Sequence, residues 1–494
     1  MITWGISANS HDAALAVFVN KELVFAGHSE RFSKKKNDRD LCHELVTYAK
    51  SWGAPDKIYW YERPFVKTLR QLYAGQGWKR RDNNVEIYLA RYGIDAPITY
   101  VDHHKSHAAA GYYTSGFDNA AVIVLDAIGE FTTYSVWEGN NLVLRKQTSL
   151  DYPNSLGLFY SAMTQRCHLT PNEDEYILMG MSAYGNPSRL TRDILNDFVQ
   201  LPNDDYQHAF RIKKNLHRGC QDWRPDLIIN DTFDIAAATQ AVYEMAFERV
   251  LQQAASLTSS RNLVLMGGCA LNCLANRLTG KYFEKTWIYP NPGDAGSAIG
   301  AVLAKNPDWQ QHTDWSNIFL GYDIASSASN EEIVEYIVQN KICGLARGKA
   351  EFGPRALGNR SLLADPRGKD IKDTVNAIKQ RQEFRPFGPA ILEEHVDMYF
   401  DMPTGWASSR YMQVVARCRH PDHYPAVVHR DGTSRVQTVP NDGSPFRKLL
   451  EVWYEKSGCP MLLNTSLNIK GKPMVNDHAD ARNFESQYGV KVFN

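Results

Sequence analysis

Short apolar runs that resemble strands alternate with stretches of helical periodicity through the first 300 residues of the sequence. The spacing of apolar residues between Asp234 and Ser256 predicts a long amphipathic helix. Strands interleaved with helices of this length are typical of α/β layering, so we expect an α/β fold. The predicted strands are Thr3–Ile6, Ala14–Val19, Ile98–Val101, Ala120–Leu125 and Leu263–Met266.

The chain, at 494 residues, is too long for one ordinary core, and roughly 150 residues per domain predicts two or three compact units. The alternation of strand-like and helical segments ends between Lys305 and Ser327, a stretch rich in Pro, Asn, Asp and Ser. A new helix is predicted at Glu331–Asn340. We therefore predict one domain over residues 1–325 and a second over residues 326–494.

Charge and composition exclude several classes of protein. Lys plus Arg and Asp plus Glu number 55 each, so there is no global positive field that would attract nucleic acid. No segment approaches the roughly 20 apolar residues of a membrane span, and the N-terminal sequence lacks the features of a signal peptide. The eight cysteines are scattered without Cys-x-x-Cys pairs. We expect a cytoplasmic protein with reduced thiols and no membrane partner.

The segment VDHHKSHAAAGYY places His103 and His107 four residues apart, on one face if the segment is helical. Neutral imidazoles favour iron, manganese or zinc over a site made of oxygen ligands alone. A structural or incidental histidine pair is the alternative at this spacing.

Two aspartates follow apolar runs and are next to small-residue turns: Asp126 in AVIVLDAIGE and Asp294 in YPNPGDAGSAIG. A carboxylate at the carboxyl end of a strand lies in the ligand crevice of an α/β sheet and can hold a metal against phosphate. Either aspartate alone could instead be a helix cap or turn residue. Together with the histidines they predict a divalent metal site, with Fe²⁺ or Mn²⁺ favoured and Mg²⁺ as a further option.

Glycines accompany these motifs. Gly267 and Gly268 end the strand in LVLMGGCALNCLAN and precede a predicted helix, so the backbone there can approach a nucleotide closely. Gly129 and Gly293 belong to the turns beside the two aspartates, and we expect them at the same nucleotide.

Cationic residues recur on predicted loops of the second domain. Converging guanidinium groups bind phosphates in a bidentate manner, whereas the alternative is solvated surface charge. The segment NTSLN ends an apolar run that begins at Met461, and its hydroxyls and amides can hold a ribose or a phosphate by hydrogen bonds. The candidate residues are Arg355, Arg360, Lys379, Arg385, Arg435, Asn464 and Ser466.

Over nearly its whole length the sequence resembles the NodU/CmcH/TobZ carbamoyltransferases. The resemblance implies an N-terminal domain of the actin-like ATPase (ASKHA) superfamily, similar to the tRNA threonylcarbamoyl-transfer enzyme, and a C-terminal YrdC-like α/β domain. The motifs that carry it, in order, are GISANSHDAA, SERF, DHHKSHAAAGYY, LDAIGE, SLGLFYSAMT, EYILMGMSAYG, GGCALNCLAN and GDAGSAIGA.

The implied activity is the conversion of carbamoyl phosphate and ATP into carbamoyl-adenylate and pyrophosphate, followed by carbamoyl transfer to a hydroxyl acceptor. The acceptor classes that the resemblance leaves open are a sugar, a natural product and a hydroxymethylated pyrimidine, free or in DNA. A homodimer is one expectation for the assembly. An actin-like ATPase or kinase that transfers phosphate is the alternative, and it would make ADP rather than AMP. A non-catalytic nucleotide-binding module is a third interpretation.

The resemblance also implies roles for individual residues. The metal of His103, His107, Asp126 and Asp294 would touch the adenylate phosphate, and Gly267, Gly268 and Asn272 would lie at the nucleotide. His11 is the candidate general base, because a histidine that titrates near neutral pH can accept the acceptor's hydroxyl proton. A structural histidine is the alternative. The carbamoyl phosphate and ATP pocket would comprise Arg355, Lys379, Arg385, Arg435, Asn464 and Ser466, with His429 and Asp431 in the same element as Arg435.

The sequence departs from the family pattern at three positions. Ala127 replaces a glycine, Ile177 replaces a lysine, and Leu467 replaces a phenylalanine. Two basic stretches, Ser33–Arg39 and Lys79–Arg81, could meet a phosphate backbone near the acceptor, and solvated surface is the alternative for both.

Overall fold

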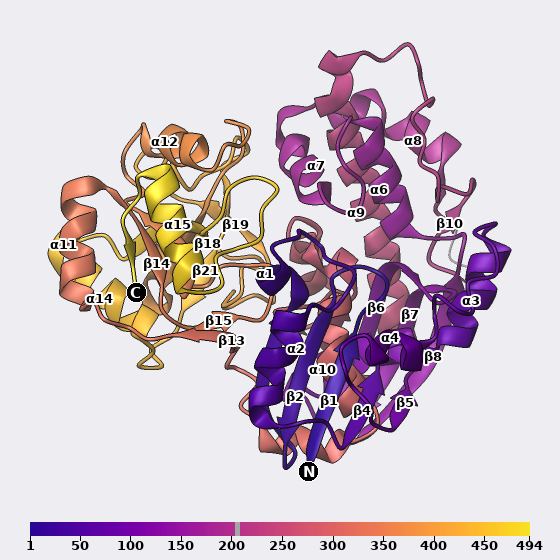
Figure 1. Ribbon diagram of the computed structural model, residues 1–494. Helices are drawn as coiled ribbons and strands as arrows, with labels where there is room; N and C mark the ends of the chain where they lie inside the picture. Colours follow the sequence, from indigo (N-terminus) through magenta and orange to yellow (C-terminus); the bar gives the residue numbers. More distant parts are fainter. Residues whose placement is uncertain (203–207) are drawn as a thin grey trace. The chain divides into compact units, whose positions relative to one another are not determined.

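The computed structural model describes residues 1–202 and 208–494, which form two compact units (Figure 1). The first unit comprises residues 1–29 and 37–316, and the second comprises residues 30–36 and 317–494. The short segment 30–36, which includes Arg31 and Phe32 of the SERF motif, therefore belongs to the second unit although it is close to the N-terminus.

The first sheet of the first unit has the order β3-β2-β1-β4-β5. β1 pairs antiparallel with β2, and β2 pairs antiparallel with β3, whereas β4 and β5 continue on the other side of β1 as parallel strands. The strands predicted at Thr3–Ile6, Ala14–Val19 and Ile98–Val101 are confirmed as β1, β2 and β5 of this sheet. The bounds are β1 Ile2–Ser7, β2 Ala14–Val19, β3 Glu22–His28, β4 Lys57–Trp60 and β5 Ile98–Tyr100.

The second sheet repeats this arrangement in the order β8-β7-β6-β11-β12. β6, β7 and β8 pair antiparallel, and β11 and β12 are parallel to β6. Two sheets with the same order and directions fit the actin-like architecture that the resemblance implies. The bounds are β6 Asn119–Gly129, β7 Thr132–Asn140, β8 Val143–Asp151, β11 Asn262–Met266 and β12 Lys285–Trp287.

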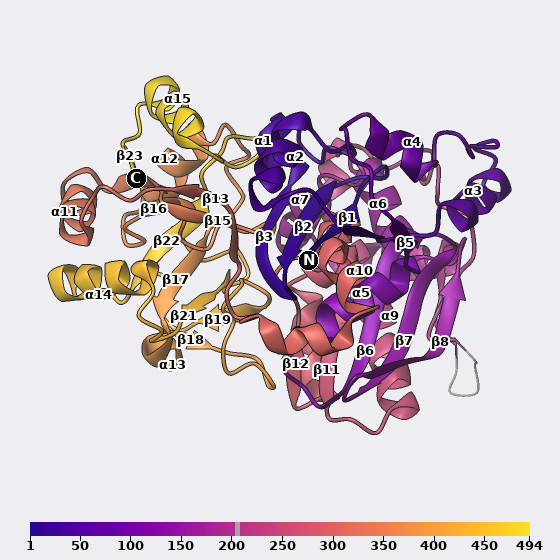
Figure 2. The ribbon, with the colours of Figure 1, turned by 60° about the horizontal axis from the view of Figure 1, so that its bottom comes forward.

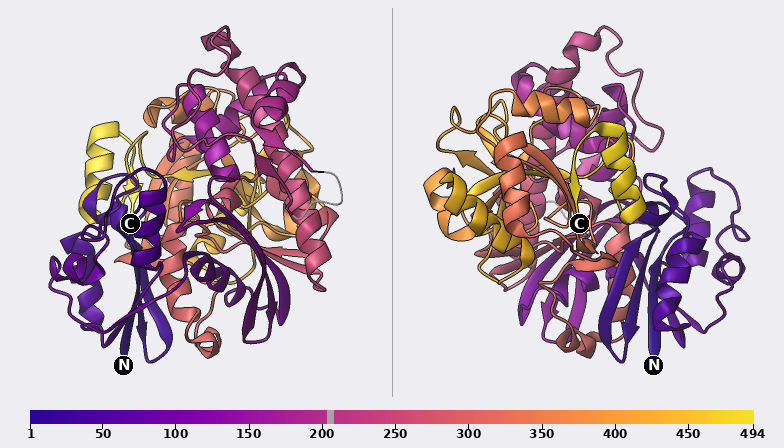
Figure 3. Two further views of the ribbon diagram at one scale, coloured as in Figure 1. Left: turned by 90° about the vertical axis from the view of Figure 1, so that its right-hand side faces the viewer. Right: turned by 60° about the vertical axis from the view of Figure 1, so that its left-hand side comes forward.

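Two helices, α5 (His103–Tyr112) and α10 (Ser297–Leu303), pack against each other between these sheets (Figure 3). α10 packs on β1 and α5 packs on β6. Glycines permit this approach: a Cβ atom at Gly5 would lie 1.8 Å from the Ala298 carbonyl oxygen, and one at Gly300 would lie 1.9 Å from the Ser106 carbonyl oxygen. The central helices are therefore held in place by close backbone packing.

The helix predicted at Asp234–Ser256 is confirmed as α9, Thr232–Leu257, which packs with α6, Leu156–Arg166, near β6 (Figures 1 and 2). In the described part of the chain, no helix is both long and apolar enough to span a membrane. All eight cysteines are free thiols, as expected. Helix α1, Ser29–Ser33, spans the point where the chain passes to the second unit. The other α-helices and strands of the first unit are α2 His43–Ala49, α3 Pro64–Tyr73, α4 Val85–Ala90, α7 Glu175–Met181, α8 Thr191–Asp197, β9 Val199–Gln200 and β10 Arg211–Ile212.

The second unit is built on a mixed six-stranded sheet of order β21-β17-β22-β16-β14-β23. β22 lies between β17 and β16 and is antiparallel to both. The bounds are β14 Ile342–Ala346, β16 Arg360–Ala364, β17 Gly388–Leu392, β21 Gln437–Val439, β22 Met461–Ser466 and β23 Val492–Phe493. Smaller strands are β13 Phe319–Ile324, β15 Gly348–Glu351, β18 Phe400–Asp401, β19 Val415–Cys418 and β20 Thr433–Arg435.

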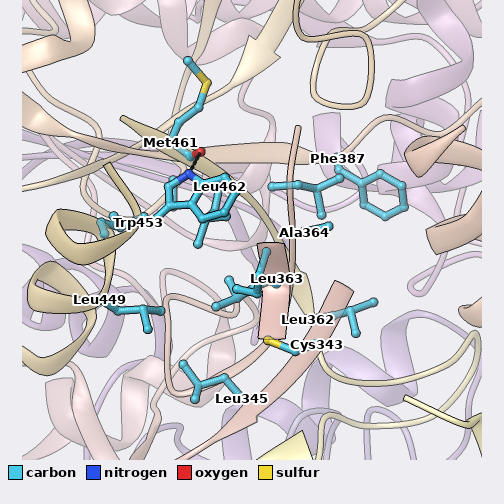
Figure 4. Close-up of a cluster of buried hydrophobic side chains, with 14 of the residues drawn as sticks. Cys343, Leu345, Leu362, Leu363, Ala364, Phe387, Leu449, Trp453, Met461 and Leu462 are labelled. Atoms are coloured by element: carbon cyan, nitrogen blue, oxygen red, sulfur yellow. Dashed lines mark hydrogen bonds between the residues drawn. The ribbon is translucent and has the colours of Figure 1, made fainter. Parts of the chain in front are cut away.

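The core of the second unit lies between its six-stranded sheet and helices that include α11 and α14 (Figure 4). The Trp453 indole donates a hydrogen bond to the Met461 carbonyl, 2.9 Å away, which satisfies the one polar group of this buried side chain. The predicted helix at Glu331–Asn340 is confirmed as α11, which begins after a capping box formed by Ser329 and Glu332. The helices are α11 Asn330–Asn340, α12 Ile371–Ile378, α13 Val396–Tyr399, α14 Pro445–Ser457 and α15 His478–Tyr488.

We predict that Gly300→Ala lowers the free energy of unfolding by about 1–3 kcal/mol, because the added methyl group forces α5 and α10 apart. Denaturant titration followed by circular dichroism measures this change. Gly293→Ala is the control, since a Cβ atom there meets nothing within 4 Å. Equal midpoints for both variants and the parent chain would contradict the packing argument.

Candidate active site

Four buried side chains of the first unit converge between its two sheets. His103 and His107 extend from α5, Asp126 lies near the end of β6, and Asp294 lies just before α10. The Nε2 atoms of the two histidines are 3.1 Å apart. His103 Nε2 is 3.2 Å from Asp126 Oδ2, and His107 Nε2 is 3.2 Å from Asp294 Oδ1. The sequence motifs thus meet in one cluster.

This cluster fits a divalent cation. One ligand atom from each of the four residues lies within 4.8 Å of all the others. His107 Nδ1 is 3.1 Å from the Pro292 carbonyl oxygen, and because a carbonyl only accepts, Nδ1 carries the proton. That leaves the Nε2 lone pair directed at the cluster, as a metal ligand requires. Two imidazoles with two carboxylates suit a transition metal with mixed nitrogen and oxygen ligands.

The charges of the cluster support the same interpretation. Burial opposes ionisation of all four groups, yet the carboxylates of Asp294 and Asp126 raise the pKa of His103 well above its usual value and also raise the pKa of His107. The imidazoles in turn hold the pKa of both carboxyl groups below the usual range. A bound cation would take the place of protons on the imidazoles, so metal binding releases protons.

Gly129 makes room for the cluster. A Cβ atom at this position would lie 2.2 Å from Cδ2 of His103, so any larger residue would displace the imidazole. Its neighbour Glu130 is buried and accepts hydrogen bonds from the Arg63 backbone amide at 2.6 Å and from Arg63 Nε at 3.0 Å. These contacts fix the turn after β6. The nucleotide role of Gly129 stays a prediction.

His11 lies at the edge of the cluster, with Nε2 3.7 Å from Asp294 Oδ2. Its side chain is 52% exposed, whereas the Asp294 side chain is 5% exposed. Desolvation acts against protonation, but the carboxylates of Asp294 and then Asp12 raise the pKa of His11 to about 10. A base role for His11 therefore requires that the charge of Asp294 be neutralised, as a cation bound by the cluster would do.

Sequence reasoning missed Lys67, which supports the loop that carries His11. This buried lysine donates from Nζ to the Asn9 carbonyl at 2.9 Å and to Ser10 Oγ at 2.6 Å, and it pairs with Glu62 at 2.6 Å. The only available signal was its place on the inward face of the amphipathic helix α3.

The candidate nucleotide residues differ in their surroundings. Gly267 has φ +90°, and a Cβ atom there would lie 2.2 Å from the Leu125 carbonyl oxygen, so the backbone requires glycine. The Gly268 amide points toward Asp126 Oδ1, 3.4 Å away. The Asn272 amide forms a reciprocal pair with Gln240 at 3.1 Å. Gly293 has open space around it.

In the second unit, Lys379 is buried against the NTSLN segment. Its ammonium donates to the carbonyl of Ser466, to Ser466 Oγ at 3.2 Å, and to the carbonyl and Oδ1 of Asn468, both at 2.9 Å. Burial lowers the pKa of Lys379 well below its usual value, and the nearby guanidinium groups of Arg381 and Arg385 act in the same direction. These four acceptors are neutral oxygens, so an anion would stabilise the charged form of the lysine.

Asn464 and Arg435 lie on neighbouring parts of the same unit. Asn464 donates to the Ala356 carbonyl at 3.1 Å and to Gln437 at 2.7 Å, which brings the loop of Arg355 beside β22. Among the residues that the structure describes, Arg435 Nε and Asn464 Oδ1 are buried without a hydrogen-bond partner. Asp431 accepts from the Thr433 amide at 3.0 Å and, with His429, shapes the turn before β20, which ends at Arg435.

Arg360 has a different environment. Its side chain is fully buried, and its guanidinium donates to five backbone carbonyls, among them those of Tyr322 at 2.7 Å and Asn476 at 3.1 Å. Burial lowers its pKa to about 10. These contacts favour a role in holding loops together, and contact with substrate stays a prediction.

Two of the three departures from the family pattern are buried apolar residues. Ile177 is 1% exposed in α7, and Leu467 belongs to the core of the second unit. Ala127 follows Asp126 and donates its backbone amide to the Asp126 side chain at 2.8 Å.

Comparisons with known proteins assign the family. Residues 61–303 match the family model described as Carbamoyltransferase N-terminus, and residues 334–493 match Carbamoyltransferase C-terminus. The chain belongs to the carbamoyltransferase family and is accordingly a transferase enzyme.

Relatives extend over most of the chain. Nodulation protein NolO of Bradyrhizobium diazoefficiens is 34% identical, covering 77% of this chain and 75% of that protein. The 3'-hydroxymethylcephem-O-carbamoyltransferase of Amycolatopsis lactamdurans is 26% identical, covering 95% and 94%. Among solved structures, T. kodakarensis HypF superposes with a TM-score of 0.39 at 12% identity, covering 63% of this chain and 48% of that one.

We predict that His107→Ala and Asp294→Ala each lower the content of bound divalent metal, because each removes one of four ligands. Elemental analysis of the purified proteins measures this content. His104→Ala is the control, since its imidazole lies on the same helix but hydrogen-bonds Ser135 at 2.7 Å. Full metal content in both ligand variants would place the metal elsewhere.

Proposed function

We propose that the chain is an O-carbamoyltransferase that forms carbamoyl-adenylate from carbamoyl phosphate and ATP and then carbamoylates a hydroxyl acceptor. The observation that carries this proposal is the buried His103, His107, Asp126 and Asp294 cluster with the half-exposed His11 at its edge. In this proposal the four residues would hold a metal that binds the adenylate phosphate, beside the solvent-accessible imidazole of His11. The name of the cephem O-carbamoyltransferase supports oxygen as the acceptor atom.

The two half-reactions are assigned to different domains. Residues 326–494 would form a YrdC-like adenylation domain, and residues 1–325 would form the actin-like transfer domain. Anionic substrates favour the first assignment, since carbamoyl phosphate and ATP together need several cations, and Arg355, Lys379, Arg385 and Arg435 lie around the end of β22. His429, Asp431, Asn464 and Ser466 would shape that pocket, and Arg360 would support its walls.

Adenylation moves the carbamoyl group from phosphate to AMP, which is a larger group for the protein to bind. With atoms balanced, carbamoyl phosphate, ATP and one water give carbamoyl-adenylate, pyrophosphate and phosphate. Lys379 and the arginines would hold the transferring phosphates, and Asn464 has an unsatisfied carbonyl oxygen that suits the carbamoyl NH₂. Binding energy from the nucleotide can then orient the reacting carbonyl.

In the transfer step the acceptor oxygen forms a bond to the carbamoyl carbon, the bond from that carbon to the AMP oxygen breaks, and the hydroxyl proton passes to His11. Lys67 and Glu62 hold the loop that positions His11. When bound, the divalent metal supplies positive charge that stabilises AMP as the leaving group. Gly129, Gly267, Gly268, Asn272 and Gly293 would line the nucleotide beside it.

We predict that Arg435→Ala and Ser466→Ala abolish pyrophosphate release that depends on carbamoyl phosphate, because each removes part of the adenylation pocket. A coupled pyrophosphate assay with purified, folded protein measures it. Arg417→Ala, at an exposed position on the neighbouring strand β19, is the control. Near-normal release in both pocket variants would refute the assignment, and formation of ADP would favour the kinase alternative.

We predict that His11→Ala lowers carbamoyl transfer by roughly 100- to 10,000-fold while pyrophosphate release survives, because only the second step needs the base. Mass spectrometry of the acceptor and the pyrophosphate assay measure the two steps separately. His43→Ala, an exposed histidine at the start of α2, is the control. Equal loss of both steps, or of neither, would leave His11 as the structural histidine.

A further inference from the structure

A buried histidine outside the four-residue cluster, His28, ends strand β3 and contacts the turn that carries Asp294. His28 is 7% exposed, and its Nε2 atom is 2.8 Å from the side-chain Nδ2 of Asn291, which is 3% exposed. An amide nitrogen only donates, so Nε2 of His28 accepts this hydrogen bond and the imidazole is neutral. The chemistry proposed above uses neither of these two side chains.

The turn that begins at Asn291 orients two of the four cluster residues. The carbonyl oxygen of the next residue, Pro292, accepts from His107 Nδ1 at 3.1 Å and from the Gly267 amide at 2.9 Å. Asp294 follows two residues later, and its Oδ1 is 3.2 Å from His107 Nε2. The orientation of this imidazole and the place of this carboxylate therefore both depend on where the turn lies.

The turn is compact, so a shift of Asn291 is passed on to Asp294. The Gly296 amide donates to the Gly293 carbonyl at 3.1 Å, and a Cβ atom at Gly296 would lie 1.9 Å from the Asn291 carbonyl oxygen. Backbone groups this close leave little room for one end of the turn to move without the other. A single hydrogen bond at Asn291 can therefore hold the whole turn.

The end of β3 also holds the loop of His11. The backbone amide of Ser29, the residue after His28, donates to the Ala13 carbonyl at 2.7 Å. Ala13 follows two residues after His11, and His11 Nε2 lies 3.7 Å from Asp294 Oδ2. One strand end therefore fixes both the loop of the candidate base and the turn of a candidate metal ligand.

We propose that His28 is a positioning residue for the metal site and that it acts through Asn291. Its hydrogen bond holds the turn of residues 291–296, so that the Pro292 carbonyl keeps the lone pair of His107 Nε2 directed at the cluster. Hydrogen bonds behind a metal ligand typically change metal affinity by about 10- to 100-fold when they are removed. This role rests on the metal site of the proposed function and deepens it.

The test measures binding of Mn²⁺ to the metal-stripped, full-length protein by competition with a fluorescent chelator. His28→Leu removes the acceptor atom and should raise the dissociation constant about 10-fold. His28→Gln should bring it back to within about 2-fold of the parent value, because the amide oxygen can accept in place of Nε2. Asn291→Leu should weaken binding as much as His28→Leu does, and the double variant should be no weaker than either single one, because all three lack the same hydrogen bond.

His104→Leu is the control, since this buried imidazole hydrogen-bonds Ser135 instead of the turn. Circular dichroism of the metal-free proteins reports their folding separately. An unchanged dissociation constant in His28→Leu would overturn the proposal. Equal losses in His28→Gln and His28→Leu would also overturn it and leave His28 as a packing residue. A parent protein that binds no Mn²⁺ would overturn the metal site of the proposed function together with this role.

Discussion

The close approach of α5 and α10 is the constraint on which the active site depends. A Cβ atom at Gly300 would lie 1.9 Å from the Ser106 carbonyl oxygen, so the two backbones touch where larger residues would separate them. α5 carries His103 and His107, and α10 begins directly after the turn of Asp294. Separating these helices would move the imidazoles away from the carboxylate. The geometry of the four-residue cluster thus depends on the size of one residue in a helix interface.

Local sequence signals predicted much of this arrangement. Strand β6 and helix α9 have clear apolar patterns. The four candidate metal ligands lie near strand ends or on one helix face, where chain geometry brings them near the same crevice. Lys67 could not be predicted, because its role depends on contacts with Asn9 and Ser10, more than fifty residues away in the sequence. A buried lysine on a helix has no local signature.

Two cations of the second unit show why composition alone cannot assign a ligand. Arg360 and Lys379 were both predicted to bind substrate, and both are buried. The guanidinium of Arg360 donates hydrogen bonds to five backbone carbonyls, so its donors are satisfied within the fold. Lys379 is held by neutral oxygens, and burial together with the neighbouring arginines lowers its pKa. A bound phosphate would stabilise the charged form of this lysine. The groups that a cationic side chain contacts, rather than its position in a motif, indicate whether it stabilises the fold or can bind substrate.

The segment 30–36 changes how the second unit must be defined. Arg31 is buried and donates to the Gly353 carbonyl at 3.0 Å, at the start of the loop that carries Arg355. Lys34 forms an ion pair with Asp480, which also accepts from the Asn476 amide just before α15. A chain that began at residue 326 would lack both contacts, leaving the Arg355 loop without one of its anchors. The proposed adenylation pocket therefore depends on residues near the N-terminus, because segment 30–36 belongs to the second unit.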